Sequence, residues 1–261
     1  MRIFHKCICN MTIFNKISGM IILCVILVLA VTSTPAAQKL WLTYDMARAF
    51  DLPVSRLSLE CHHDNIALNQ GELTLCLTPE NGQSKRCEAS FKLLEYAPSQ
   101  HQIHYDFHLD EHMAAASNLY IISQVHALPD KQEPWRCPPL SFDVKNSTFF
   151  AHNRWDTNKI TEDPHNKCIH STSSIQGRKV LDGISLPEEQ AWHEVNLDLT
   201  LSTENGSLAL QLNEHQSDVL NGPNTYNDRR PPFLKLGIYN PHNAKIEKRQ
   251  CITFKNIMIS R

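Results

Sequence analysis

Residues 192–213 read WHEVNLDLTLSTENGSLALQLN. Apolar and polar residues alternate over 192–202 and again over 207–213, and successive side chains of an extended chain point to opposite faces. Each run therefore predicts a strand with one apolar face. Asn205-Gly206 lies between the two runs, and this dipeptide is typical of a tight hairpin turn. The stretch predicts an antiparallel hairpin whose leucines pack on a core.

The same alternation recurs along the rest of the chain, separated by turn signals. Few windows show a helical period, and only 45–52 suggests a short helix. Many short alternating strands indicate an all-β antiparallel sandwich, or jelly roll. Residues 127–190 are rich in Pro, Asn, Asp and His, so long loops are expected there. Further strands are predicted over 72–78, 85–96, 101–109, 119–126, 234–239 and 251–260.

The first 37 residues look like a targeting segment. Three basic residues precede an apolar run over 20–31, and small residues follow it. This order predicts a secretory signal peptide cut near Ala36 or Ala37. An uncleaved membrane anchor is the alternative, but a membrane span needs about 20 apolar residues. We therefore expect residues 38–261 to be a secreted or periplasmic single domain, with no membrane contact once the leader is removed.

The composition of the mature chain limits its partners. Without the leader, 22 basic residues face 27 acidic ones, a net charge of −5. Such a chain is not a polycation, so nucleic acid is not an expected partner and any polyanion must bind a local cluster. We expect a monomer. Six cysteines remain, which predicts disulfides, although six allow 15 pairings.

Metal binding is not expected from the sequence. The cysteines form no C-x-x-C pair, which argues against a structural zinc site. CHHD over 61–64 offers two histidines, but adjacent side chains of an extended segment point to opposite faces. No cofactor is predicted, although a structural calcium ion is compatible with a chain of this type.

Three predicted strands carry polar residues on the face opposite their apolar one. Arg86 and Glu88 share such a face, and so do Gln124 and His126. In LKLGIY, residues 234–239, Lys235 and Tyr239 flank Gly237, which could let a ligand lie close to the backbone. A single polar residue on a strand is usually only solvated. Three strands of this kind in an exported all-β chain instead predict a binding surface.

These residue types suit one reaction, the cleavage of a uronic-acid polymer by β-elimination. The sugar carboxylate must be neutralised while the neighbouring C5 proton leaves, and an arginine and an amide can do this. A base must take the C5 proton and an acid must protonate the O4 leaving group, tasks that suit His and Tyr. Arg86, Gln124, His126 and Tyr239 supply that set.

The motifs resemble those of a known enzyme group. QVH (124–126) is similar to the Q-[IV]-H motif of the jelly-roll alginate lyases, FLKLGIYN (233–240) to their Y-F-K-A-G-x-Y-N strand, and RCE (86–88) to the start of their R-[ST]-E-x-R strand. The longer stretch 192–240 more closely resembles the heparin-lyase-like and glucuronan-lyase-like branches. In pieces, the resemblance covers most of 85–260. It implies a concanavalin A-like jelly roll and a polysaccharide lyase acting on an acidic polysaccharide.

The resemblance also implies roles for individual residues. Tyr239, with or without His126, would transfer protons, and Arg86 and Gln124 would hold the carboxylate. Lys235 and its polar neighbour Glu88 would bind substrate. Asn224 and Tyr226, in a loop before the Lys-Tyr strand, could close over the groove and bind substrate too, although a solvated loop is equally compatible with the sequence.

Two departures weaken alginate as the substrate. Ser90 stands where the alginate-lyase pattern has a second Arg, and Pro241 stands where it has Gln. Two other functions stay open at this stage. One is a non-catalytic carbohydrate-binding domain on the same scaffold, since fold does not fix function. The other is a glycoside hydrolase, which needs two carboxylates across its groove, whereas Glu88 is the one acid on the motif strands.

Overall fold

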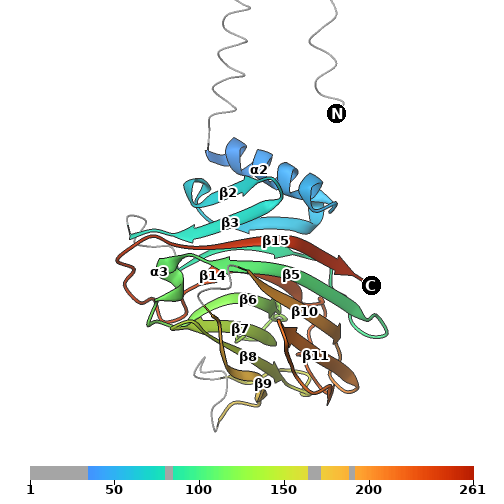
Figure 1. Cartoon of the computed structure of the whole chain (residues 1–261). Helices are drawn as coiled ribbons and strands as arrows, with labels where there is room; N and C mark the ends of the chain where they lie inside the picture. The colour runs from blue at the N-terminus through green and yellow to red at the C-terminus, as the bar shows by residue number, and fades with distance from the viewer. Residues whose placement is uncertain (1–34, 80–84, 164–171, 188–191) are drawn as a thin grey trace, which may run out of the picture. The chain divides into compact units, whose positions relative to one another are not determined.

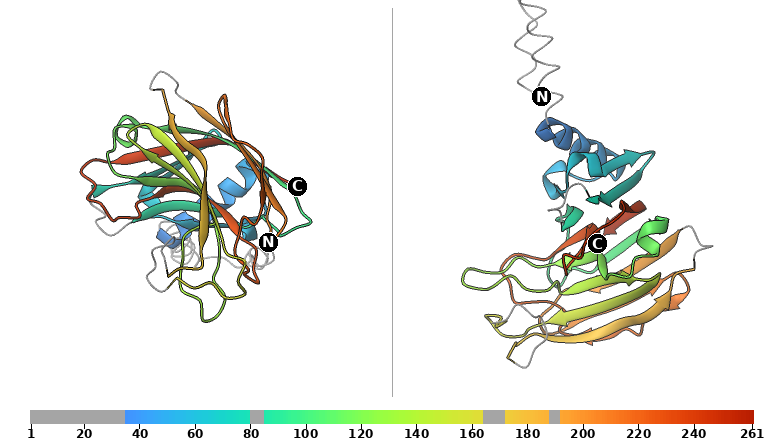
Figure 2. Two further views of the ribbon diagram at one scale, coloured as in Figure 1. Left: turned by 90° about the horizontal axis from the view of Figure 1, so that it is seen from below. Right: turned by 90° about the vertical axis from the view of Figure 1, so that its left-hand side faces the viewer.

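A computed structural model describes residues 35–79, 85–163, 172–187 and 192–261. Residues 42–261 form one compact unit, and the account below concerns that unit. It is a sandwich of two antiparallel sheets (Figure 1). Figure 2 shows from two further sides how these curved sheets face each other across the core. The predicted all-β jelly-roll class is therefore confirmed.

The first sheet has seven strands and contains all three motif strands. The motif strands β4, β14 and β6 are direct neighbours in it. In sheet order its strands are β1 (Leu57–Glu60), β4 (Arg86–Phe91), β14 (Phe233–Tyr239), β6 (Tyr120–His126), β7 (Leu140–Lys145), β8 (Thr148–Trp155) and β9 (Gln176–Ser185).

The second sheet covers the other side of the core. The predicted hairpin forms its β10–β11 pair, with Leu197 opposite Leu210. In order its strands are β12 (His215–Gln216), β11 (Gly206–Leu212), β10 (His193–Thr200), β5 (His101–Leu109), β15 (Gln250–Ser260), β3 (Glu72–Leu77) and β2 (Ile66–Asn69), and β13 (Leu220–Gly222) pairs with β11.

The core lies between the two sheets and follows the alternation in the sequence. Leu197, Leu199 and Leu210 from one sheet are buried against Leu234 and Leu236 from the other. Burying such side chains is the main favourable contribution to folding, at about 1.5–3 kcal/mol each. The apolar faces of the motif strands therefore fix their polar faces outward.

Helices are few among the described residues. The helix predicted over 45–52 is in fact the longer α2 (Pro35–Ala49), and Met46 and Ala47 in it belong to the core. None of the described helices is long and apolar enough to span a membrane. The predicted leader 1–37 lies outside the described residues except for its last three. The remaining helices are short: η2 (Val54–Arg56), η3 (His63–Asn65) and α3 (Glu111–Ala114).

Long loops were expected over 127–190, and residues 127–139 do form one, but the region also contains strands that were not predicted. Strands β7, β8 and β9 lie within it and form one edge of the seven-stranded sheet. Asn146 and Ser147, both with positive φ, make the tight turn between β7 and β8. Such a turn joins adjacent antiparallel strands. The polar composition of the region hid this hairpin.

The prediction of disulfides is confirmed. Cys61 is bonded to Cys87, and Cys76 to Cys251. Cys137 is disulfide-bonded as well. The first of these bonds joins the segment after β1 to β4, and the second joins β3 to β15. Disulfides are characteristic of proteins that fold in an oxidising compartment.

Candidate active site

The sheet register brings the predicted site residues together on one face. Tyr239 in β14 lies opposite Arg86 in β4, while Lys235 lies opposite Gln124 in β6. Phe233, at the start of β14, lies opposite His126. Since side chains two apart share a face of the sheet, these groups form one polar surface across three strands.

A network of ion pairs forms the floor of this surface. Nζ of Lys235 lies 2.7 Å from Oε1 of Glu60 and 3.3 Å from Oε2 of Glu88. An NH group of Arg86 lies 3.3 Å from Glu60 and 3.4 Å from Glu88. The side-chain amide of Gln124 donates a hydrogen bond to Glu88. Two cations and one amide thus converge on two carboxylates.

Most of the network is buried, although the sequence suggested a displayed surface. Lys235, Gln124 and Glu88 are only 2–3 % exposed. Burial raises the pKa of Glu88, and the neighbouring Lys235 and Arg86 oppose that shift. For Glu60 burial acts in the same direction, but Lys235 and Arg86 outweigh it and its pKa is lowered. A buried ion-pair network holds its members in fixed positions because breaking any pair leaves an uncompensated charge.

Tyr239 stands at the more open side of the network. The Arg86 guanidinium lies over its ring, 4.3 Å from the centroid. Within the described part of the chain, no group is hydrogen-bonded to the Tyr239 hydroxyl. The arginine therefore holds the ring while the hydroxyl stays available to a bound molecule.

His126 has a defined tautomer. Its Nδ1 lies 2.7 Å from the Ala127 carbonyl oxygen, which can only accept, so Nδ1 carries the proton and Nε2 keeps its lone pair. Burial, with the positive charge of Lys235 nearby, lowers the pKa of His126 to about 4. The imidazole is therefore neutral at pH 7 and can accept a proton or a hydrogen bond through Nε2.

A glycine is required at position 237 for a different reason from the one that the sequence suggested. A Cβ at this position would lie 2.2 Å from the Cys87 carbonyl oxygen and 2.7 Å from Cα of Glu88. Its φ of +149° also disfavours other residues, and the β14–β6 register shifts beside it. The glycine therefore permits close approach to the backbone of β4, rather than close approach of a ligand.

The structure does not bring Asn224 and Tyr226 into this surface. Tyr226 is fully buried, and its hydroxyl donates to the Cys137 carbonyl. The Asn224 side chain is buried too, and it bonds the backbone of Thr200 and Ser202. Both side chains tie the loop to the backbone of neighbouring segments, so neither is placed to contact a substrate.

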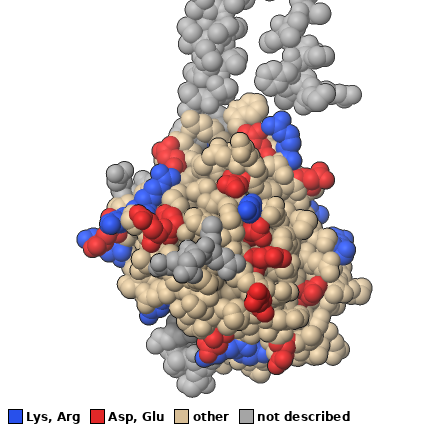
Figure 3. Space-filling view, in the orientation of Figure 1, with Lys and Arg blue, Asp and Glu red and all other residues tan. Residues whose placement is uncertain are grey.

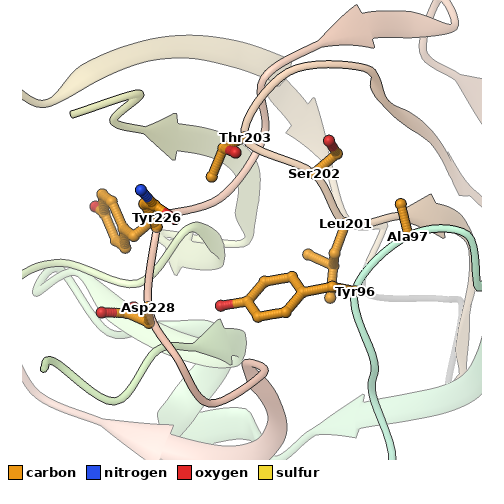
Figure 4. A pocket seen from close by; sticks show the side chains of 8 residues that line it. Tyr96, Ala97, Leu201, Ser202, Thr203, Tyr226 and Asp228 are labelled. Carbon is orange, nitrogen blue, oxygen red and sulfur yellow. The ribbon is translucent and has the colours of Figure 1, made fainter. Parts of the chain in front are cut away.

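A small cavity lies beside that loop but does not change this conclusion. It has a volume of about 180 Å³ and is lined by Tyr96, Leu201, Tyr226 and Asp228 among others. Figure 4 shows the Tyr226 and Asp228 side chains turned away from its centre. The Asp228 carboxylate instead binds Arg136. With Asp228 paired to Arg136, the lining offers no free carboxylate for catalysis.

The geometric argument against a metal at CHHD is corrected by the structure. His63 begins the short helix η3, so the segment is not extended there. The rings of His62 and His63 lie 4.3 Å apart, and both contact Asp64. The three could offer ligand atoms within 4.8 Å of one another. A closed structural zinc site takes four protein ligands, and these three residues offer one ligand atom each.

Glu60 is the network member that the sequence did not reveal. It ends β1, an edge strand of the sheet, and is paired with Glu88 in register. A lone glutamate at a strand end carries no distinctive pattern. Its role depends on β1 lying beside β4, a contact between segments more than 20 residues apart.

The opposite sheet bears a different charge. Asp106, Glu194 and Asp198 stand on the outer side of β5 and β10. Figure 3 shows acidic side chains running down the middle of this face. A polyanion would be repelled there, so the polar surface of the seven-stranded sheet is the candidate site.

Jelly rolls occur in carbohydrate-binding proteins such as lectins. A sequence model of the family described as "Polysaccharide lyase" matches residues 63–257. The chain belongs to this family and is a polysaccharide lyase. The resemblance of the motifs to jelly-roll lyases is thereby confirmed.

Solved structures show the same fold at low identity. An endo-β-1,4-glucuronan lyase from the fungus Trichoderma reesei is 14% identical, with a TM-score of 0.56 over 78% of this chain and 87% of that one. An alginate lyase of polysaccharide lyase family 7 is 12% identical, with a TM-score of 0.53 over 82% of this chain and 97% of that one. A search among curated proteins finds no match.

Proposed function

We propose that this protein is an exported lyase that cleaves a uronic-acid-containing polysaccharide by β-elimination, acting as a monomer and without a metal ion. The observation that carries the proposal is the register that places Arg86, Gln124, His126 and Tyr239 on one face of three adjacent strands. The disulfides support export, because they form in oxidising compartments.

The reaction assigns a task to each group. Arg86 uses one NH group within the network, so its other donors can neutralise the substrate carboxylate. Gln124 supports it from within the network, where its amide is bonded to Glu88. As the C5–H bond breaks, a double bond forms between C4 and C5, and the C4–O4 electron pair leaves with O4. His126 Nε2 would take the C5 proton while the Tyr239 hydroxyl gives its proton to O4, or Tyr239 would do both by accepting the C5 proton as it gives its own to O4.

The charge of the groove floor favours an unsulfated polymer. Glu60 and Glu88 already balance Lys235 and Arg86, so little positive charge is left over for sulfate groups. A single carboxylate per sugar needs only local donors. Glucuronan and other unsulfated polyuronates are therefore the first substrates to test.

The test is ultraviolet absorbance of residues 38–261 with alginate, glucuronan, hyaluronan, chondroitin and heparin. β-Elimination leaves a conjugated 4,5-unsaturated uronate that absorbs where the substrate does not. We expect a rise with an unsulfated polyuronate. Binding without any rise would favour the alternative, a carbohydrate-binding domain. New reducing ends without absorbance would indicate a glycoside hydrolase, although Glu60 and Glu88 bind the same ammonium rather than facing each other across a groove.

The low pKa of His126 predicts an unusual pH profile. With His126 as the base, the neutral imidazole is the active form, and it protonates only below its pKa of about 4. We expect kcat/KM to stay level from pH 7 down to about 5 and then to fall about tenfold per unit below 4. Initial rates in a constant-ionic-strength buffer series test this. A break near pH 6.5 that disappears in His126→Gln would show an ordinary imidazole instead.

Chelation is expected to leave turnover unchanged. The NH groups of Arg86 that are not used in the network would donate to the substrate carboxylate in place of a metal ion. The rate after dialysis against EDTA should match the untreated rate. Loss of turnover with restoration by calcium or zinc would contradict metal-free catalysis, and His62→Ala would then show whether the CHHD segment holds the ion.

A further inference from the structure

Trp135 is the most exposed of the large apolar side chains in the described ranges, at 64%. It lies in the Trp135 loop, residues 127–139, which joins β6 to β7. Charged residues near it in the chain are buried instead, since the side chains of Glu133 and Arg136 are only 2% and 1% exposed. An exposed tryptophan on a mobile loop would need no explanation, but this loop is not built as a mobile one.

Buried charges anchor the loop on both sides of Trp135. Arg136 binds Glu133 at 3.1 Å and also pairs with Asp228, from the segment before β14. The two Glu133 oxygens accept the backbone N–H groups of Thr161 at 2.7 Å and Asp130 at 2.8 Å. Breaking buried pairs of this kind is costly. Trp135 is therefore held in place while its ring remains in solvent.

The ring extends the candidate active site. Trp135 meets the His126 ring edge-to-face, with 5.7 Å between centroids. His126 in turn contacts the Phe233 ring at 5.6 Å, and Phe233 lies 5.9 Å below Nζ of Lys235. A row of rings thus leads from the ion-pair network to the exposed tryptophan.

We propose that Trp135 is a sugar-binding platform that stacks on the apolar face of a pyranose ring next to the uronate that is cleaved. The C–H groups of a sugar face carry small positive charges, which the negative face of an indole attracts. A fixed platform binds a flexible polymer well, because little ordering remains to be done on binding. The inference rests on the proposed function, since it assigns a neighbouring subsite of the same groove.

Kinetics on the preferred polyuronate test the platform. Trp135→Ala should lower kcat/KM at least about tenfold, mainly through KM, while Trp135→Phe should stay within about threefold of the wild type. Trp192→Ala is the matched control, because Trp192 contacts Lys255 and His108 of the other sheet. It should leave both constants unchanged. Equal KM values for Trp135→Ala and the wild type would overturn the inference.

A binding measurement separates this inference from the proposed function. In Tyr239→Phe, which should not turn over, addition of polyuronate should change the tryptophan fluorescence, and the change should vanish in Tyr239→Phe/Trp135→Ala. If no polymer is cleaved but this signal is present, the lyase proposal fails and the platform stands. If turnover is normal and the signal is the same with and without Trp135, the platform fails and the lyase proposal stands.

Discussion

Tyr239→Phe should reduce kcat about 10³-fold while leaving substrate binding almost unchanged. Proton transfer by a positioned side chain contributes about 10²- to 10⁴-fold to a rate, and this substitution removes the proton without removing the ring. The Arg86 guanidinium would still lie over the phenyl ring, so the carboxylate-binding side of the groove should keep its shape. A stopped turnover with retained binding is the signature of a lyase rather than a binding domain.

The measurement is initial-rate absorbance together with calorimetric binding of the same polymer. Removing the hydroxyl leaves no hydrogen bond broken within the described residues, so the urea midpoint should match that of the wild type. Tyr96→Phe serves as the control, because the Tyr96 hydroxyl bonds the Arg230 carbonyl in a loop. A Tyr239→Phe enzyme with half the wild-type rate would remove Tyr239 from the proton-transfer role.

The sandwich and its motif strands were predictable because their information is local. Alternation over 192–202 and 207–213 requires one buried face, and that requirement fixes which way each polar residue points. The same logic placed Lys235, Gln124 and Arg86 on the outer face of their strands. The order of the strands in the sheet was not predicted, and the position of β14 between β4 and β6 is known only from the structure.

The parts that could not be predicted depend on long-range contacts. Glu60 belongs to the network only because β1 lies beside β4. Trp135 reads as an ordinary loop residue until Arg136 is seen to pair with Asp228, 92 positions further along the chain. Asn224 and Tyr226 were expected at the surface because polar loops usually are, whereas here they satisfy backbone carbonyls of other segments, at Thr200 and Cys137.

The structural role of Gly237 could not be predicted from the sequence either. A glycine in a strand signals either a bulge or a close approach, and the sequence does not say what approaches. The structure identifies the neighbour as the backbone of β4, with the Cys87 carbonyl oxygen 2.2 Å from where a Cβ would stand. A requirement of sheet pairing was thus mistaken for a requirement of ligand binding.

Gly237→Ala should therefore destabilise the fold by about 3 kcal/mol or more, since it adds a backbone collision to an unfavourable φ. Gly183→Ala is the matched control. Gly183 also has a positive φ, +75°, but nothing lies within 4 Å of its added Cβ, so only about 1 kcal/mol should be lost. Urea unfolding monitored by fluorescence gives both values.

Because the collision is with the strand that carries Arg86 and Glu88, the Gly237→Ala variant should also lose activity at temperatures where it remains folded. If the two variants had equal midpoints, strand contact would not be the reason for the glycine, and close approach of a ligand would again be the better explanation.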